Sequence, residues 1–353
     1  MSEWKEVTLG GLGNIVTGKT PLKSNPEDWG MVMPFITPTD YKNYRKVAIF
    51  STRELSNEGI ERLNNKIIPE NSVLVTCIGS DMGKVVINGV EVITNQQINT
   101  IIPDPDVIDT NFLFYLIVEM YDLLRVWGGD GTAVPIINKG DFEKLPTRIP
   151  TMPKQKAIAS VLSSLDDKID LLHRQNKTLE AMAETLFRQW FVEEAREDWE
   201  DGLLGDLVDV KYGKDHKKLT DGTFPVYGSG GIMRYAEKAL YENESVLIPR
   251  KGTLNNVIYI NEPFWTVDTM FYTIMKKPNL AKFIYLFVKG KDLASMNVGS
   301  AVPSMTTQVL NNMPLQIPPE KDLEYFEYMV KPSFRKIKSN QNQIQILLRR
   351  PGW

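Results

Sequence analysis

The sequence predicts an α+β protein, in which two mixed α/β globules alternate with two long helices that pair antiparallel as a coiled coil. Three observations predict it: an internal repeat, an apolar heptad between the two copies, and short β-branched runs inside each copy. The expected order is a globule at 1–152, a helix at 153–196, a second globule at 197–319 and a second helix at 320–353.

Length and composition set the limits of this prediction. The chain has 353 residues, with 42% hydrophobic and 24% charged residues, which suits two globules with connecting elements. No run approaches the roughly 18 apolar residues that a membrane span needs, and the start lacks the pattern of a signal peptide. The single cysteine, Cys77, allows no internal disulfide. We therefore expect a protein of the reducing cytoplasm.

The same counts narrow the chemistry. With one cysteine and two histidines, His173 and His216, a Cys/His zinc site is excluded, and we expect no catalytic histidine. The net charge of −3 argues against non-specific coating of nucleic acid. Localised binding stays open, because the charge on one face decides it.

The internal repeat covers most of the chain. Residues 2–21 align without a gap with residues 197–216, and later blocks align at smaller offsets, so the second copy is shorter inside. The block Gly131–Pro135 matches Gly299–Pro303, and Leu145-Pro146 matches Met313-Pro314. The first alignment matches Trp4/Trp199, Leu9/Leu204, Gly10/Gly205, Leu12/Leu207, Gly18/Gly213 and Lys19/Lys214.

Each globule contains runs that are typical of strands, broken by Gly, Asn and Pro. One helix per globule is expected, near 111–124 and near 280–290. The strand-like runs are 73–79, 84–89 and 96–102 in the first copy, and 245–250, 256–261 and 270–275 in the second.

The segment 154–194 contains neither Gly nor Pro and carries a heptad. Apolar residues alternate in steps of four and three, which is the a/d seam of a coiled coil. Asn176 falls on this seam, where a polar residue either fixes the register or marks a solvated edge. The seam runs through Ile158, Leu162, Leu165, Ile169, Leu172, Asn176, Leu179, Ala183, Leu186 and Trp190.

The second helix carries the same seam with more polar residues. Ser333 and Asn340 stand where leucines are expected, and the helix is shorter than the first. We expect the two helices to pair antiparallel, because the intervening globule must carry the chain back; recruitment of another protein by the seam remains open. Its apolar positions are Phe326, Val330, Ile337, Ile344 and Leu347.

Residues Gly13–Thr20 match the phosphate-binding loop pattern G-x-x-x-x-G-K-[ST]. That loop works between a strand and a helix, whereas Pro21 and the residues after it are a poor helix start. The second copy keeps Gly213 and Lys214 but replaces the outer positions with Val208 and Asp215. A nucleoside triphosphatase is therefore an alternative rather than the preferred reading.

Several side chains suit contacts with nucleic acid. Lysines gather after the repeated glycine, and Asn or Gln side chains can bind adenine edges, although they equally satisfy turns. Hydroxyls in polar loops suit phosphate contacts. The candidates are Lys19, Thr20, Asn95, Gln96, Gln97, Thr132, Lys139, Lys211, Lys214, Lys217, Lys218, Arg250, Lys251, Ser300, Thr306 and Thr307.

These features together resemble the specificity (S) subunit family of type I restriction–modification systems. The motifs are the opening W-x-x-x-x-L-G-x-L with its later Gly-Lys, the block G-[ST]-A-V-P before each helix, and Leu186–Phe191 at the end of the first helix. Each motif is weak alone, but they occur in the right order along essentially the whole chain.

The resemblance implies two target-recognition domains that read the halves of a bipartite, asymmetric site in double-stranded DNA. The helices would set the spacing and dock two modification subunits, which hold S-adenosylmethionine and methylate adenine. Restriction subunits that use ATP would join, and this chain would bind no cofactor and catalyse nothing. Segment Leu186–Phe191 has no copy after the second helix. Either the docking site for one modification subunit is therefore weakened, or the chain is trimmed. The main alternative is a coiled-coil scaffold whose globules bind protein.

Overall fold

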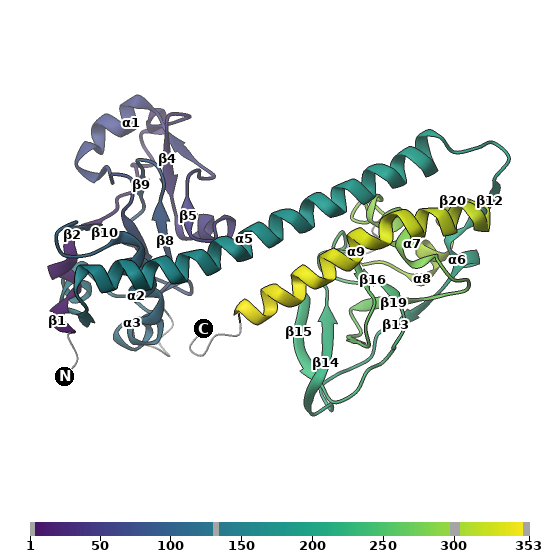
Figure 1. Ribbon diagram of the computed structural model, residues 1–353. Coiled ribbons are helices and arrows are strands. Elements are labelled where there is room, and N and C mark those ends of the chain that lie inside the picture. The colour runs from purple at the N-terminus through teal and green to yellow at the C-terminus, as the bar shows by residue number, and fades with distance from the viewer. Residues whose placement is uncertain (1–3, 130–133, 297–303, 349–353) are drawn as a thin grey trace. The chain divides into compact units, whose positions relative to one another are not determined.

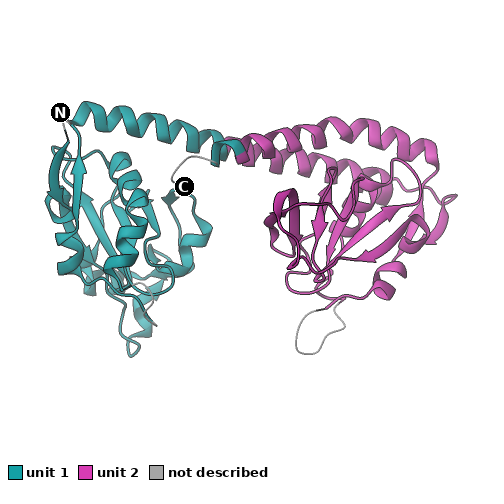
Figure 2. Cartoon of the chain, turned by 90° about the horizontal axis from the view of Figure 1, so that it is seen from below, with its two compact units in different colours: residues 1–170, 346–353 teal, residues 171–345 magenta. Residues whose placement is uncertain are grey.

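A computed structural model describes residues 4–129, 134–296 and 304–348. The chain forms two compact units, unit 1 at 1–170 and 346–353, and unit 2 at 171–345 (Figure 2). The long helix that the sequence predicts between the globules therefore contributes to both units. No helix among the described residues has the length and hydrophobicity to cross a membrane.

Unit 1 is built on a five-stranded sheet in the order β2-β10-β7-β8-β5 (Figure 1). The strands pair antiparallel, except that β5 runs parallel to β8. A smaller sheet has the order β3-β6-β4-β9, and β1 pairs with β11 where the chain enters and leaves the unit. The main strands are β2 (Gly13–Thr17), β5 (Val47–Ala48), β7 (Val73–Thr76), β8 (Val85–Asn88) and β10 (Ile98–Pro103).

Helix α2 (Thr110–Glu119) covers the main sheet of unit 1 and is buried along most of its length. The single helix expected near 111–124 is in fact two helices, because the chain breaks at Met120 before α3. The other elements are β1 (Lys5–Thr8), β3 (Trp29–Gly30), β4 (Met33–Ile36), β6 (Glu54–Leu55), β9 (Ile93–Thr94), β11 (Pro146–Ile149), α1 (Asn57–Arg62), α3 (Tyr121–Trp127), α4 (Lys139–Lys144), and 3-10 turns at Leu9–Leu12, Pro26–Asp28, Pro38–Asn43 and Asn64–Lys66.

Unit 2 repeats this framework with a sheet in the order β13-β19-β16-β17. Its strands take the places of β2, β10, β7 and β8, and β12 pairs with β20 as β1 does with β11. The elements are β12 (Glu200–Leu203), α6 (Leu204–Leu207), β13 (Val208–Tyr212), β14 (Asp221–Gly228), β15 (Gly231–Ala236), β16 (Ser245–Pro249), β17 (Ile258–Ile260), β18 (Trp265–Thr266), β19 (Met270–Met275), α7 (Ala281–Lys289), α8 (Thr307–Asn311) and β20 (Pro314–Ile317).

Helix α5 (Met152–Arg188) ends in a π-helical turn at Gln189–Glu193, and α9 spans Glu320–Leu348. Within unit 2 they pack antiparallel: Asn176 contacts Asn340, whereas Trp190 stacks on Tyr325. The predicted antiparallel pairing is thus confirmed. The seam positions Ile169, Leu172, Val330 and Ile344 are buried, and Leu162, Leu165, Leu179 and Ile337 are half-buried.

The seam prediction is wrong at Ile158, which is 36% exposed. The first turns of α5 pack on the core of unit 1, so the buried stripe there follows Gln155 and Ala159 instead. The Gln155 side chain donates to the carbonyls of Val107 and Pro150 and accepts from the Asp109 amide. A heptad fitted along the whole helix misses this change of partner.

Candidate nucleic-acid interface

The repeated Gly-Lys pair sits against the turn that precedes β10 in unit 1 and β19 in unit 2, the strands that pair with β2 and β13. In unit 1 the amides of Gly18 and Lys19 donate to the carbonyls of Ile98 and Thr94, at 3.2 and 2.9 Å. In unit 2 the amides of Gly213 and Lys214 donate to the carbonyls of Met270 and Thr266, at 3.0 and 2.9 Å. The two units therefore hold the lysine on the same backbone framework.

Close backbone approach explains why glycine is repeated here. A Cβ on Gly18 would lie 2.2 Å from the Asn95 carbonyl oxygen, and one on Gly213 would lie 2.0 Å from that of Val267. Such distances are far inside van der Waals contact, so only glycine fits without moving the turn. The glycine thus serves packing of the turn against β2 or β13.

This geometry contradicts the alternative of a phosphate-binding loop. Gly13–Thr17 is strand β2, and the next element after Lys19 and Thr20 is a short 3-10 turn at Pro26–Asp28. A phosphate-binding loop needs a helix N-terminus directly after it. The letter-for-letter match is therefore coincidental.

A second loop joins each Gly-Lys pair from the end of the neighbouring strand. The amide of Cys77 donates to the Gln97 carbonyl in unit 1, and the amide of Arg250 donates to the Thr269 carbonyl in unit 2, both at 2.8 Å. The chain then turns at Gly79 with φ +88° and at Gly252 with φ +87°. We call these loops the loop edge: Gly18–Thr20, Cys77–Gly79 and Asn95–Gln97 in unit 1, and Gly213–Lys218, Arg250–Gly252 and Val267–Thr269 in unit 2.

The loop edge of unit 1 brings together five of the residues that the sequence suggested. Thr20 donates its hydroxyl to Oε1 of Gln96 at 2.6 Å, and Lys19 is exposed beside them. Asn95 is buried, and its side chain bonds the amide of Gln97 at 3.1 Å and the Gln97 carboxamide at 2.8 Å. Asn95 therefore fixes the turn, while Gln96 is exposed.

The loop edge of unit 2 is richer in positive charge. Lys214, Lys217 and Lys218 are exposed and form no ion pair with any residue that the structure describes. Lys251 is exposed as well, and the Arg250 guanidinium lies 5.4 Å from the centre of the Tyr212 ring and donates to the Asp268 carbonyl at 3.0 Å. These side chains form a basic surface that can contact a phosphate backbone.

Other candidates lie elsewhere or have structural partners. Lys211 is on β13 in an ion pair with Asp209 at 3.5 Å, and Lys139 opens α4 and pairs with Glu143 at 3.4 Å. Thr306 caps α8, because its hydroxyl accepts the Val309 amide at 3.2 Å, and Thr307 is the first residue of that helix. The last two candidates, Thr132 and Ser300, lie outside the described residues.

Sequence reasoning missed a hairpin that lies next to the loop edge of unit 2. Strands β14 and β15 pair antiparallel around Gly228–Gly231, and the Asn256 side chain donates to the Ser229 carbonyl at 2.7 Å. Ile232 and Met233, at its tip, are exposed. The sequence Gly228-Ser-Gly-Gly231 was the available signal, since Gly-rich pairs mark tight hairpin turns.

Comparison with known proteins agrees with this architecture. The chain matches the family described as type I restriction modification DNA specificity domain over residues 1–181 and 196–345. It is 26% identical to the type I restriction enzyme MjaIX specificity subunit of Methanocaldococcus jannaschii, covering 98% of this chain and 90% of that protein. It is also 37% identical to the HindI specificity subunit of Haemophilus influenzae, over 42% of this chain and 32% of that protein.

A solved structure shows the same fold. The crystal structure of the S subunit of a type I restriction–modification system from M. genitalium superimposes with a TM-score of 0.63 at 18% identity, covering 98% of this chain and 93% of that one. Two repeats of one framework, each with a loop edge, thus coincide with a family match along almost the whole chain. The chain belongs to the type I restriction–modification DNA specificity family, as a non-catalytic subunit that supplies the DNA sequence specificity of such a system.

Proposed function

We propose that unit 1 and unit 2 each read one half of a bipartite, asymmetric DNA target. The observation that carries this proposal is that the loop edge keeps its backbone hydrogen bonds in both units but changes its side chains. Gln96 of unit 1 stands where Asp268 stands in unit 2, and Cys77 stands where Arg250 stands. Amide, carboxylate and guanidinium groups favour different base edges. A common framework with different side chains suits two different half-sites.

Affinity and specificity have separate sources in this proposal. Lys19, Lys214, Lys217 and Lys218 are exposed and form no ion pair with a residue that the structure describes. They contact phosphates, which adds affinity without sequence preference. Base edges are read by the exposed loop-edge side chains that differ between the units, such as Gln96 and Asp268. Salt therefore weakens binding to every duplex, whereas loop-edge substitutions change the preferred sequence.

The paired helices act as the spacer between the half-sites. Helix α5 is 37 residues long, or about 55 Å at 1.5 Å per residue. Duplicating residues 162–168 adds one heptad before the stretch that pairs with α9, so the seam keeps its phase. The helix gains about 10 Å, which equals about 3 base pairs of duplex at 3.4 Å each. We expect the non-specific spacer of the target to lengthen; an unchanged target with unchanged affinity would count against the spacer role.

The proposal extends to the partners and their cofactors. Two modification subunits dock on the helices and carry S-adenosylmethionine, and restriction subunits that use ATP join this assembly in the cytoplasm. This chain itself binds neither cofactor. Support comes from membership of the specificity family.

The direct test is to sequence the host genome for methylated adenines with and without this gene. We expect a bipartite motif whose two halves differ and which disappears on deletion. Complementation with the wild-type gene should restore the motif, and complementation with Lys214→Ala should restore it with lower occupancy. A methylome that is identical with and without the gene would refute the proposal.

A nucleotide-binding assay separates this proposal from the triphosphatase alternative. We expect no ATP or GTP binding by the wild type, and no difference in the Lys19→Ala variant. Nucleotide binding that disappears in Lys19→Ala would instead favour the triphosphatase. DNA binding by Lys19→Ala should fall by a similar factor for specific and unrelated duplexes, because a phosphate contact carries no sequence information.

A further inference from the structure

The hairpin of strands β14 and β15 is attached to the loop edge of unit 2. The amide of Val267 donates to the Tyr227 carbonyl at 3.0 Å. A Cβ on Gly252 would lie 2.9 Å from Oγ of Ser229, so these two segments are in close contact. The tip of the hairpin, which we define as residues 228–233, therefore lies directly beside the loops that carry the exposed lysines.

A β-bulge at the tip leaves two apolar side chains in solvent. Val226 pairs with Arg234 and Tyr227 with Ile232, so that Met233 has no partner in the opposite strand. Such an extra residue breaks the alternation of side chains along a strand. Ile232 is 45% exposed and Met233 is 60% exposed. The hairpin thus presents two adjacent apolar side chains on β15, which is the edge strand of its sheet.

The turn of the hairpin leaves room for a molecule from outside. A Cβ on Gly230 would meet no atom of a described residue within 4 Å, and the φ of this residue is not positive. Neither packing against the described residues nor the backbone conformation therefore requires glycine at this position. Close approach of a ligand to the backbone is a further use of glycine. A Cβ on Gly228 would instead lie 2.5 Å from Sδ of Met233, so this glycine makes room for the methionine on the turn.

Positive charge lies on the loops beside the tip. Lys251 is exposed and precedes Gly252 in the chain. Lys214 is exposed as well, and its amide donates to the carbonyl of Thr266, the residue before Val267. Apolar side chains next to lysines suit a polyanion that exposes apolar groups. The major groove of B-DNA admits a two-stranded β-ribbon, and the apolar group that it exposes is the C5-methyl group of thymine.

Unit 1 has a different element at the same point of the framework. Strand β4 pairs parallel with β9 as β14 pairs with β18, so Ile36 corresponds to Tyr227. The Ile36 carbonyl accepts the Asn95 amide at 3.1 Å, so this end of β4 also adjoins the loop edge. The chain then forms the 3-10 turn Pro38–Asn43 instead of a hairpin. The apolar tip is therefore a feature of unit 2 that the repeat does not share.

We propose that Ile232 and Met233 recognise thymine methyl groups in the major groove of the half-site that unit 2 reads. The inference rests on the proposed function, because it assumes that unit 2 binds DNA at its loop edge. The lysines beside the tip hold the phosphates, and the apolar pair contacts the methyl group. The glycine turn allows the hairpin to approach the bases closely.

Deoxyuridine tests the proposal, because it differs from thymine only by the missing methyl group. The full chain is titrated with duplexes that carry its methylation motif. In the half of the motif that is retained when residues 1–150 are exchanged, each thymine is replaced singly by deoxyuridine. At one or more of these positions, binding should weaken about fourfold, which is the factor for burial of one methyl-sized group.

Variants of the chain show whether the hairpin makes this contact. In Ile232→Ser combined with Met233→Gln, the thymine and deoxyuridine duplexes should bind with equal affinity where the wild type distinguishes them. The matched control is Val32→Ser combined with Met31→Gln, which makes the same kind of change at two exposed residues of unit 1. This control should keep the wild-type ratio of affinities. Thermal denaturation should show that both double variants are folded.

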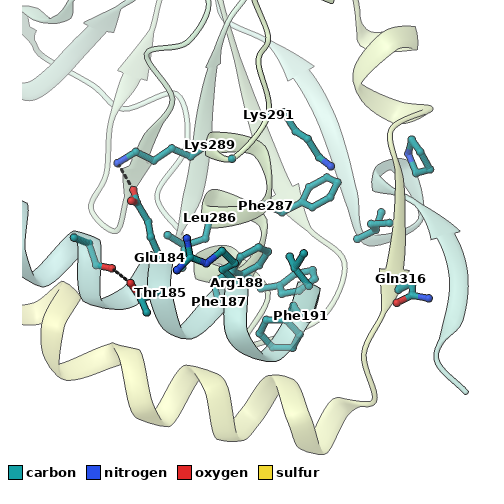
Figure 3. Close-up of a pocket in the computed structure, with 16 residues that line it drawn as sticks. Glu184, Thr185, Phe187, Arg188, Phe191, Leu286, Phe287, Lys289, Lys291 and Gln316 are labelled. Atoms are coloured by element: carbon teal, nitrogen blue, oxygen red, sulfur yellow. Dashed lines mark hydrogen bonds and ion pairs between the residues drawn. The ribbon is translucent and has the colours of Figure 1, made fainter. Parts of the chain in front are cut away.

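Three single variants separate this ratio from affinity in general. Lys251→Ala should weaken both duplexes by the same factor, because a phosphate contact carries no sequence information. Lys291→Ala removes the same charge after α7, where Nζ lies 4.6 Å from the centre of the Phe287 ring (Figure 3), and should change neither affinity. Gly230→Gln should weaken both duplexes without lowering thermal stability, because its side chain takes the space that the DNA needs.

The inference is wrong if no deoxyuridine in the unit 2 half weakens binding, or if that half contains no A·T pair. It is also wrong if the preference for thymine persists in the Ile232→Ser, Met233→Gln chain. A wild-type chain that binds its unmodified motif no better than an unrelated duplex would instead refute the proposed function, and this inference with it. The two failures are distinct, because the second is seen before any thymine is replaced.

Discussion

The side chain of Asn340 donates through Nδ2 to Oδ1 of Asn176, at 2.8 Å, across the paired stretch of α9 and α5. Asn340 is fully buried, and its own Oδ1 has no partner among the described residues. A buried polar pair at one seam position favours a single register, because any shift leaves both side chains without a partner. The Asn176 expected on the seam therefore meets the asparagine that interrupts the seam of the second helix.

Compared with leucines at the same two positions, the asparagine pair should lower the free energy of unfolding while it fixes the register. Asn340→Ala removes a hydrogen bond and leaves a small cavity, so the free energy of unfolding should fall by about 1–2 kcal/mol. The double variant Asn176→Leu with Asn340→Leu should instead raise it by about 1 kcal/mol or more, because buried polar surface is replaced by apolar surface. Urea denaturation measures both. A double variant less stable than Asn340→Ala would contradict this account of the pair.

Lys282 of α7 is almost fully buried and forms ion pairs with Glu327 at 2.8 Å and Glu244 at 3.1 Å. Glu327→Ala leaves the lysine short of one partner in the core, and we expect a loss of about 3–5 kcal/mol. Lys282→Phe combined with Glu327→Ala copies the Phe112 and Ala159 arrangement of unit 1 and should recover most of that loss. A double-mutant cycle from denaturant unfolding measures the recovery, and a simple sum of the two single losses would contradict it.

The exposed lysines of unit 2 should act on affinity rather than on sequence choice. Each of Lys214→Ala and Lys217→Ala should reduce the slope of log K against log salt concentration by about 0.9, if each lysine neutralises one phosphate. Lys321→Ala, in the first turn of α9, is a matched control with the same change of charge. Titration of fluorescent duplexes at several salt concentrations provides the slopes. Equal slopes for all three variants would contradict a contact at the loop edge.

Burial raises the pKa of the Cys77 thiol to about 12, so the folded chain keeps this thiol protonated. Iodoacetamide should modify Cys77 very slowly at pH 8 in the native protein and rapidly in denaturant, because the thiolate is the nucleophile. The thiol of the unfolded chain ionises near its ordinary pKa, whereas the buried thiol of the folded chain stays protonated. The folded state is therefore fully stable with respect to this group below the ordinary pKa, and it loses that stability as pH rises through 9 toward 12. Mass spectrometry measures the labelling, and the Cys77→Ala variant should show a smaller decline in stability over that range.

The repeat made most of the architecture predictable. Matches such as Gly18 with Gly213 identify positions where the backbone itself is constrained, and the structure shows those constraints as close contacts with a carbonyl oxygen. The strands at 73–79, 96–102 and 270–275 followed from β-branched runs, and β7, β10 and β19 confirm them. Local patterns sufficed where local packing decides the conformation.

The loop edge was harder to predict, because it depends on contacts between distant segments. Thr20 and Gln96 are 76 residues apart in the chain, yet their side chains share a hydrogen bond. Thr306 has the composition of a phosphate contact, but its hydroxyl caps a helix. Ile158 follows the heptad but lies outside the packed seam, because α5 changes its partner along its length. Such assignments need the tertiary structure.

The most direct test of the central claim is an exchange of the first globule. Residues 1–150 are replaced by the matching globule of another specificity subunit, and methylated adenines are mapped in a host that lacks the native gene. We predict a motif in which one half changes and the other half is retained. A motif that changes in both halves, or in neither, would contradict the claim that each unit reads its own half of the target.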